Sequence, residues 1–91
     1  MLQVIWLQRA VNDLAEIWNR GDSTLYREVT EAANTIDRTL RDDPFGSSES
    51  REGPIRVMFA PPLGVSFAVD QDSGTVLVAQ IWRLPPPRRR V

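Results

Sequence analysis

Two predicted amphipathic helices, joined by a connection of only two or three residues, constrain the fold of this chain more than any other feature. The first covers residues 10–20, and the second starts near residue 22 or 23 and has its apolar residues between positions 25 and 40. Gly21 ends the first, and Asp22 or Ser23 can cap the second. So short a connection predicts an antiparallel helical hairpin. The predicted buried stripe of this hairpin comprises Val11, Leu14, Trp18, Leu25, Val29, Ile36 and Leu40.

A β-sheet is the layer against which the hairpin can bury that stripe. Residues 2–7 are apolar and predict a strand that is covered on both faces. Alternating apolar residues predict three further strands, near residues 55–59, 65–69 and 76–82. In the last of these, Val76, Val78 and Trp82 are expected on one face. The stretch 45–54 is rich in Gly, Ser and Glu and predicts a loop.

The predicted order is β-α-α-β-β-β. It indicates an α+β domain in which an antiparallel helical hairpin packs on one face of a small, mostly antiparallel sheet. With 91 residues the chain can form one core, and we assign it to residues 1–84. Residues 85–91 form a Pro/Arg-rich tail, expected to be extended because proline has no N–H for a strand ladder.

Cysteine and histidine are both absent, which excludes disulfides, a thiolate nucleophile and the usual zinc sites. The acidic residues do not have the spacing of a calcium loop, so we expect no metal and no small-molecule cofactor. No stretch approaches the roughly 18–20 apolar residues of a membrane span, and residues 1–7 lack the basic start of a signal peptide. The cytoplasm is therefore the expected location.

Positive charge is concentrated in the second half of the chain. Residues 12–52 contain ten acids and five arginines, whereas residues 53–91 contain two acids and five arginines. Every basic residue is arginine. A GC-rich genome would give the same bias, but the planar guanidinium also suits phosphate recognition.

Four sequence segments follow one another in a set order: residues 36–40 with Asp43-Pro44, then 46–51, 62–70 and 76–83. In this order they resemble the RelE/ParE superfamily of toxins from bacterial toxin–antitoxin pairs. The resemblance implies a toxin that is silenced by a cognate antitoxin protein. RelE-like members cleave messenger RNA on the ribosome, whereas ParE-like members inhibit DNA gyrase without known nuclease chemistry.

RNA cleavage of this kind needs a base, an acid and positive charge on the reacting phosphate. The candidate catalytic residues are Arg51, Arg56 and Arg83. Glu49 and Glu52 are the nearby proton carriers, and exposure of the three arginines on one sheet face would give a phosphate-binding patch. Alternatively, the arginines form ordinary ion pairs with Glu49, Glu52 and Asp70.

Two departures from the family pattern weaken the nuclease hypothesis. Residues 63–67 read Leu-Gly-Val-Ser-Phe where many members have an arginine within a Tyr-Arg phrase, and no tyrosine or histidine follows Arg83. The candidate nucleic-acid-binding residues are Arg88, Arg89, Arg90 and Trp82. Alternatively, the arginines are a solvated tail, and Trp82, like Trp6, is a core residue.

The favoured function at this point is that of a RelE-like toxin, a metal-independent mRNA endoribonuclease that acts on translation at the ribosome. The alternatives are a ParE-like, non-nucleolytic inhibitor of DNA gyrase and a RelE-fold interaction domain that has lost its catalytic site. In either toxin hypothesis the partner is an antitoxin, which we expect to cover a sheet edge or the hairpin surface.

Overall fold

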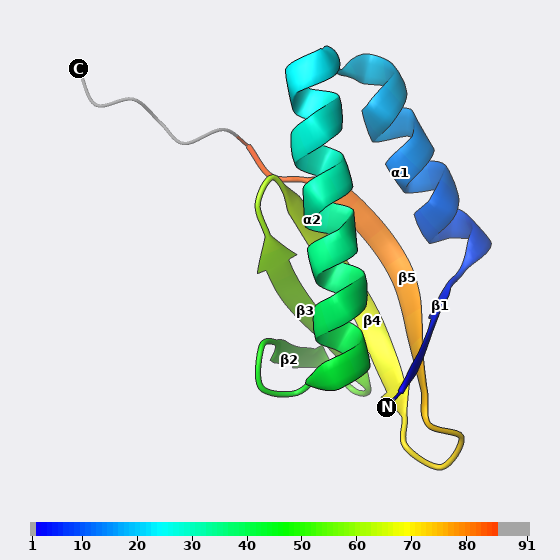
Figure 1. The fold of residues 1–91 in the computed structure, drawn as a ribbon. Helices are drawn as coiled ribbons and strands as arrows, with labels where there is room; N and C mark the ends of the chain where they lie inside the picture. The colour runs from blue at the N-terminus through cyan, green and yellow to red at the C-terminus, as the bar shows by residue number, and fades with distance from the viewer. Residues whose placement is uncertain (1, 86–91) are drawn as a thin grey trace.

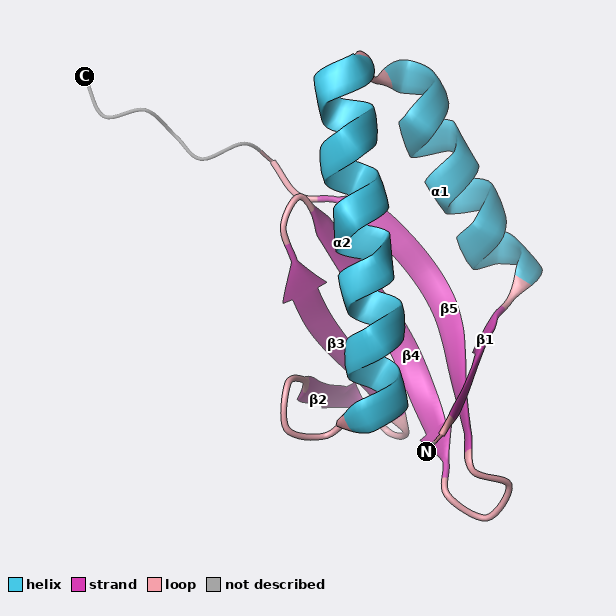
Figure 2. Ribbon diagram, viewed as in Figure 1, coloured by secondary structure: helices cyan, strands magenta, loops and turns pink. Residues whose placement is uncertain are grey.

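The computed structural model describes residues 2–85. This part of the chain contains β1 (Gln3–Trp6), α1 (Gln8–Arg20), α2 (Ser23–Asp42), β2 (Glu49–Glu52), β3 (Ile55–Ala60), β4 (Leu63–Asp70) and β5 (Thr75–Arg83). The strands form one sheet in the order β1-β5-β4-β3-β2, in which β1 is parallel to β5 and the other neighbours are antiparallel. Both helices lie on one face of the sheet (Figures 1 and 2). This two-layer α+β architecture confirms the predicted fold class.

The turn between the helices is fixed by a helix cap. The Asp22 side chain accepts a hydrogen bond from the backbone N–H of Leu25 at 2.9 Å, so Asp22, of the two predicted candidates, is the N-cap of α2. Gly21 allows the close approach, because a Cβ there would lie 2.5 Å from the Leu25 side chain. Neither helix combines the length and apolar character that crossing a bilayer requires.

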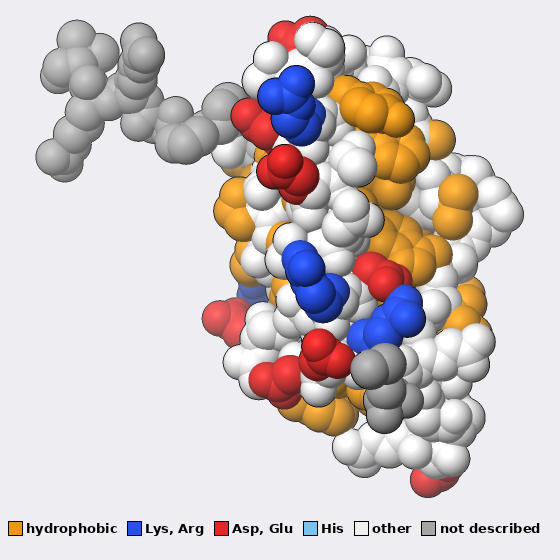
Figure 3. Space-filling view, viewed as in Figure 1, with side chains coloured by type: hydrophobic (Ala, Val, Ile, Leu, Met, Phe, Trp, Pro, Cys, Tyr) orange, Lys and Arg blue, Asp and Glu red, His pale blue; other side chains and the backbone are white. Residues whose placement is uncertain are grey.

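The core lies between the helices and the sheet, and thirteen buried residues form it: Ala10, Leu14, Val29, Ala32, Ile36, Leu40, Met58, Leu63, Val65, Phe67, Val76, Val78 and Ile81. Of the predicted stripe, Leu14, Val29, Ile36 and Leu40 are buried, and Trp18 and Leu25 are half-buried at its margin. Figure 3 shows apolar side chains gathered in a band between α1 and α2.

Val11 was predicted wrongly as a core residue. Its side chain is 45% exposed, while Ala10 is completely buried. The buried stripe of α1 is turned toward Ala10, Leu14 and Ile17, which follow one another at i, i+4 and i+7. From the sequence, Val11 is the better candidate for burial, because valine has more apolar surface to bury than alanine.

The prediction that the first strand is covered on both faces is also wrong. Within the sheet formed by the described strands, β1 lies at an edge and pairs with β5, and the helices cover one of its faces. Val4 and Trp6 pack against the core, whereas Ile5 and Leu7 are each 40% exposed. Trp6 is a structural residue, because its Nε1 also donates to Asp37 Oδ1 at 3.3 Å.

A short strand, β2, lies within the stretch predicted to be a loop. Its residues are all exposed and polar or charged, and it pairs with β3 through Glu49↔Val57 and Ser50↔Arg56. Backbone hydrogen bonds at the sheet edge hold this strand in place. It buries no side chains, so its sequence shows no alternation of apolar and polar residues. A turn at Gly53, with φ of 55°, connects it to β3.

A β-bulge in β5 changes which residues of that strand face the core. Ser66 pairs with Gln80 and Phe67 pairs with Val78, so Ala79 is an extra residue without a partner on β4. After the bulge Ile81 is buried in the core, and Trp82 lies on the opposite face, across from Gly64. The prediction that Trp82 shares a face with Val76 and Val78 is therefore wrong.

Candidate functional site

The face of the sheet away from the helices is the candidate functional surface, and we call it the open face. Strand alternation and register place the following residues of β3, β4 and β5 on it: Ile55, Val57, Phe59, Gly64, Ser66, Ala68, Leu77, Gln80 and Trp82. None of these carries an ionisable side chain; the same alternation also places the carboxylate of Asp70 on this face, at the end of β4 opposite Thr75. An uncovered sheet face of this composition is suited to binding a macromolecule.

Phe59 and Trp82 form an aromatic corner on the open face. Their ring centroids are 6.5 Å apart and the ring planes meet at 81°, an edge-to-face contact. The two residues flank Gly64 in one row across three strands. A Cβ on Gly64 would lie 2.5 Å from Trp82 Nε1, so the indole rests directly on the backbone of β4. Phe59 is 48% exposed and presents its ring to solvent.

A polar cluster of Arg9, Gln80 and Ser66 lies next to this corner. With the Gln80 amide oxygen turned toward Arg9, it accepts from Nη2 at 2.6 Å and from Nη1 at 3.1 Å. The other end of the amide is 3.5 Å from Ser66 Oγ. Within residues 2–85 the ion pairs are Arg20 with Glu16 and Arg41 with Asp37, so Arg9 has no carboxylate partner there. Its exposed guanidinium is available for an anionic group.

The position of Arg9 follows from the way in which α1 is attached to β5. Asp13 Oδ2 accepts a hydrogen bond at 3.1 Å from the backbone N–H of Ile81, two residues after the bulge. β1 ends opposite Val78, so among the described residues no strand lies beside the edge of β5 beyond that point. Arg9, one helical turn before Asp13, can therefore reach Gln80. The sequence gives no sign of this role, because Arg9 precedes the predicted helix and belongs to no motif.

Arg56 supports the loop that leads into β2. Its Nε donates to Ser48 Oγ at 2.7 Å, and Nη2 donates to the carbonyl oxygens of Ser48 and Phe45 at 3.1 and 3.4 Å. The guanidinium also lies 5.1 Å from the centre of the Phe45 ring. In register Arg56 pairs with Phe67, which places it on the helix side of the sheet.

The structure places the three candidate catalytic arginines at two ends of the sheet. Arg51 is exposed on β2, close to Arg56 at one end. Arg83 is exposed at the other end, where it pairs with Leu63, which in turn pairs with Ala60. Ala60 is four residues after Arg56 in β3, so Arg56 and Arg83 are separated by about 13 Å along the strand direction. None of the three forms an ion pair with Glu49, Glu52 or Asp70 in the described structure. Arg88, Arg89 and Arg90 lie outside the described residues.

The arrangement of a helical hairpin on one face of a mostly antiparallel sheet is shared with solved structures of RelE and ParE toxins. No family model and no curated protein sequence matches the chain. Among solved structures, the RelBE2 toxin–antitoxin complex from Mycobacterium tuberculosis aligns with a TM-score of 0.75 and 12% identity over 90% of each chain.

Two further structures extend the likeness. The chromosomal ParDE toxin–antitoxin system from P. aeruginosa aligns with a TM-score of 0.75 and 17% identity, over 93% of this chain and 98% of that one. The isolated E. coli RelE toxin aligns with a TM-score of 0.66 and 12% identity, over 96% of this chain and 88% of that one. The resemblance seen in the sequence is thus confirmed for the fold, across RelE and ParE structures alike.

Proposed function

We propose that this protein is the toxin of a toxin–antitoxin pair and acts by binding its target through the open face. The observation that carries the proposal is the aromatic corner of Phe59 and Trp82 beside Arg9, on a fold shared with RelE and ParE toxins. Exposed aromatic rings and an arginine without a carboxylate partner are typical of binding hot spots. A cognate antitoxin is the second partner.

Binding without cleavage agrees best with the geometry. Cleavage requires a proton acceptor, a proton donor and positive charge around one phosphate. Arg51 and Arg56 lie at the opposite end of the sheet from Arg83, and the carboxylate among the open-face positions of β3, β4 and β5, Asp70, lies at the end of β4 away from the pairing with Arg83. The proposed mode is therefore ParE-like, a non-nucleolytic inhibitor for which the family resemblance suggests DNA gyrase as the target.

Ribosome-associated mRNA cleavage is the second candidate. It is favoured by the same aromatic corner, because exposed rings can stack on unpaired bases while Arg9 contacts a phosphate. In this case Arg51, Arg56 and Arg83 would bind phosphate along the RNA, with Trp82 as a stacking residue and Arg88, Arg89 and Arg90 as an electrostatic anchor. Such an enzyme would be metal-independent.

Inducible expression in bacteria, with and without the adjacent small open reading frame, tests the proposal. We expect growth arrest that is relieved when the neighbouring gene is expressed. Phe59→Ala should weaken the arrest, whereas Tyr26→Ala should not, because Tyr26 is similarly exposed at 53% but lies on the helical hairpin. Absence of arrest, or equal loss in both variants, would contradict an open-face toxin.

The mode of action is decided by assays on the same cultures. Loss of DNA supercoiling activity of gyrase, with unchanged RNA ends, supports the binding mode. New RNA ends that disappear in Arg51→Ala, Arg56→Ala or Arg83→Ala variants would instead establish the cleavage mode. Thermal melts are needed for Arg56→Ala in particular, because Arg56 also holds the loop at Ser48.

A further inference from the structure

The two edges of the sheet differ in how they are protected against pairing with another chain. At one edge, β2 carries Glu49, Arg51 and Glu52, all exposed, and its register with β3 shifts after Ser50. Charged side chains and bulges of this kind keep an edge strand from pairing. At the other edge, β1 lies in residues 2–8, which contain no charged residue and no proline. Of the usual protections, only a short length of four residues applies to β1.

The backbone groups of β1 that point away from β5 have no partner within residues 2–85. The N–H groups of Gln3 and Leu7 donate at 2.9 Å to carbonyl oxygens on the β5 side. In an extended strand, the residues between them direct their N–H and C=O groups to the opposite side. Val4 and Trp6 are therefore turned outward, and no described backbone group bonds to them there. They form a free pairing edge.

Exposed apolar side chains are concentrated beside this edge. Ile5 and Leu7 are each 40% exposed, and Val11 of α1 is 45% exposed. The Val11 N–H donates to the Leu7 carbonyl oxygen at 3.1 Å, so the first turn of α1 adjoins the end of the strand. Half of the large apolar side chains that are exposed in the described part of the chain thus lie between positions 5 and 11. Such a concentration marks a surface for protein contact.

We propose that this edge pairs with β1 of a second copy of the chain, in antiparallel orientation. A pairing centred on Ile5 sets Val4 opposite Trp6 of the second copy, so the outward N–H and C=O groups of both residues bond to one another. Ile5 then faces Ile5 of the second copy in the closer, non-hydrogen-bonded type of pair. Because the strand is uncharged, pairing with itself brings no like charges together.

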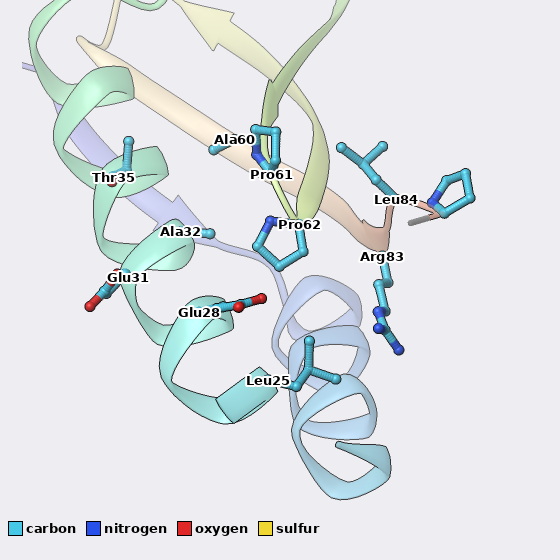
Figure 4. A pocket seen from close by; sticks show the side chains of 11 residues that line it. Leu25, Glu28, Glu31, Ala32, Thr35, Ala60, Pro61, Pro62, Arg83 and Leu84 are labelled. Carbon is cyan, nitrogen blue, oxygen red and sulfur yellow. The ribbon is translucent and has the colours of Figure 1, made fainter. Parts of the chain in front are cut away.

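The dimer leaves the other surfaces of each copy free. Its two-fold axis is perpendicular to the sheet, so both open faces lie on the same side of one continuous sheet. A groove of about 700 Å³ between α2 and the β3–β4 turn is lined by Ala32, Pro62 and Leu84 among others, and none of its lining residues comes from β1 (Figure 4). The inference does not depend on the proposed function, because β1 contributes no residue to the aromatic corner.

Analytical ultracentrifugation of the complete chain between roughly 1 μM and 1 mM tests the proposal. One short strand gives an interface below the roughly 1,200 Å² of standard complexes, so we expect a dimer with a Kd on the order of 100 μM. The amides of Val4 and Trp6 should exchange more slowly as the protein concentration rises, whereas those of Ser50 and Glu52 at the other edge should not. A monomer at every concentration, or protection of Val4 and Trp6 that is independent of concentration, would overturn the proposal.

Charge variants at the axis provide the matched comparison. Ile5→Lys and Ile5→Glu each set like charges opposite one another, and each should raise the Kd about tenfold or more. An equimolar mixture of the two folded variants should recover association, because opposite charges then meet. Tyr26→Lys is the control, since Tyr26 is 53% exposed on the helical hairpin, and it should leave the Kd unchanged.

Two results would refute pairing through β1. One is unchanged dimerisation in Ile5→Lys, and the other is a mixture of the folded Ile5 variants that associates no better than either variant alone. Protection of the Val4 and Trp6 amides that is seen only after the product of the neighbouring gene is added would assign the edge to that partner and refute self-pairing.

Discussion

Replacing Gly64 by alanine places a methyl group against the indole of Trp82. The added Cβ would lie 2.5 Å from both Nε1 and Cε2 of the ring. Carbon contacts are optimal at about 3.5–4.0 Å, so the ring must move outward by about 1 Å. Overpacking of this kind costs about 1–3 kcal/mol, and alanine regains about 0.5–1 kcal/mol over glycine in a strand. We therefore expect a net destabilisation of up to about 2.5 kcal/mol.

Urea unfolding followed by circular dichroism, in the wild-type and Trp82→Ala backgrounds, isolates the contact as a double-mutant cycle. Without the indole the clash is absent, so Gly64→Ala should become stabilising by about 0.5–1 kcal/mol. Gly74→Ala is the control: its φ of 68° makes alanine unfavourable, with no atom within 4 Å, so its effect should be the same in both backgrounds. Destabilisation by Gly64→Ala that is equal in both backgrounds would refute the described aromatic corner.

Three further predictions concern the scaffold. Leu40→Ala removes a completely buried side chain and should lower the free energy of unfolding by about 2–5 kcal/mol, whereas exposed Val11→Ala should change it by less than about 0.5 kcal/mol in the same urea titration. Asp22→Ala removes the α2 cap and should cost about 1 kcal/mol, with faster amide exchange in the first turn of α2. Arg56→Ala should accelerate amide exchange over residues 45–52, because Arg56 donates two hydrogen bonds to Ser48 in this loop. Arg56→Lys should restore slow exchange poorly, because one ammonium cannot replace the two-pronged guanidinium. Unchanged exchange in Arg56→Ala would refute the role of Arg56 in holding the loop.

The helical hairpin and the three long antiparallel strands were predictable because local patterns determine them. The stop at Gly21, the cap at Asp22 and the period of α2 all lie within a few residues of one another. β2 was not predictable, since its four exposed residues pair through the backbone alone. The burial of Ala10 in place of Val11 depends on how α1 rests on the sheet, which is a tertiary property.

The candidate site was less accessible to sequence reasoning than the fold. Trp82 was identified as a possible stacking residue, but its face is decided by the bulge at Ala79. Next to that bulge, Asp13 accepts a hydrogen bond from the backbone of Ile81, 68 residues away in the chain. Arg9 reaches Gln80 across a similar distance, and Arg56 bonds a loop rather than facing the open side. Contacts at such separations leave no periodic signal.

The parallel pairing of β1 with β5 determines when this protein can acquire its structure during synthesis. β5 is made last of the seven elements, yet it lies between β1 and β4, with Gln3 opposite Thr75 and Trp6 opposite Val78. Until β5 leaves the ribosome, β1 has no neighbour and the nascent hairpin cannot complete its hydrophobic layer. The row of Phe59, Gly64 and Trp82 forms only when β5 docks on β4. The growing chain therefore remains without its open face until β5 has been synthesised and has docked between β1 and β4, so this sheet cannot be completed strand by strand in the order of the sequence.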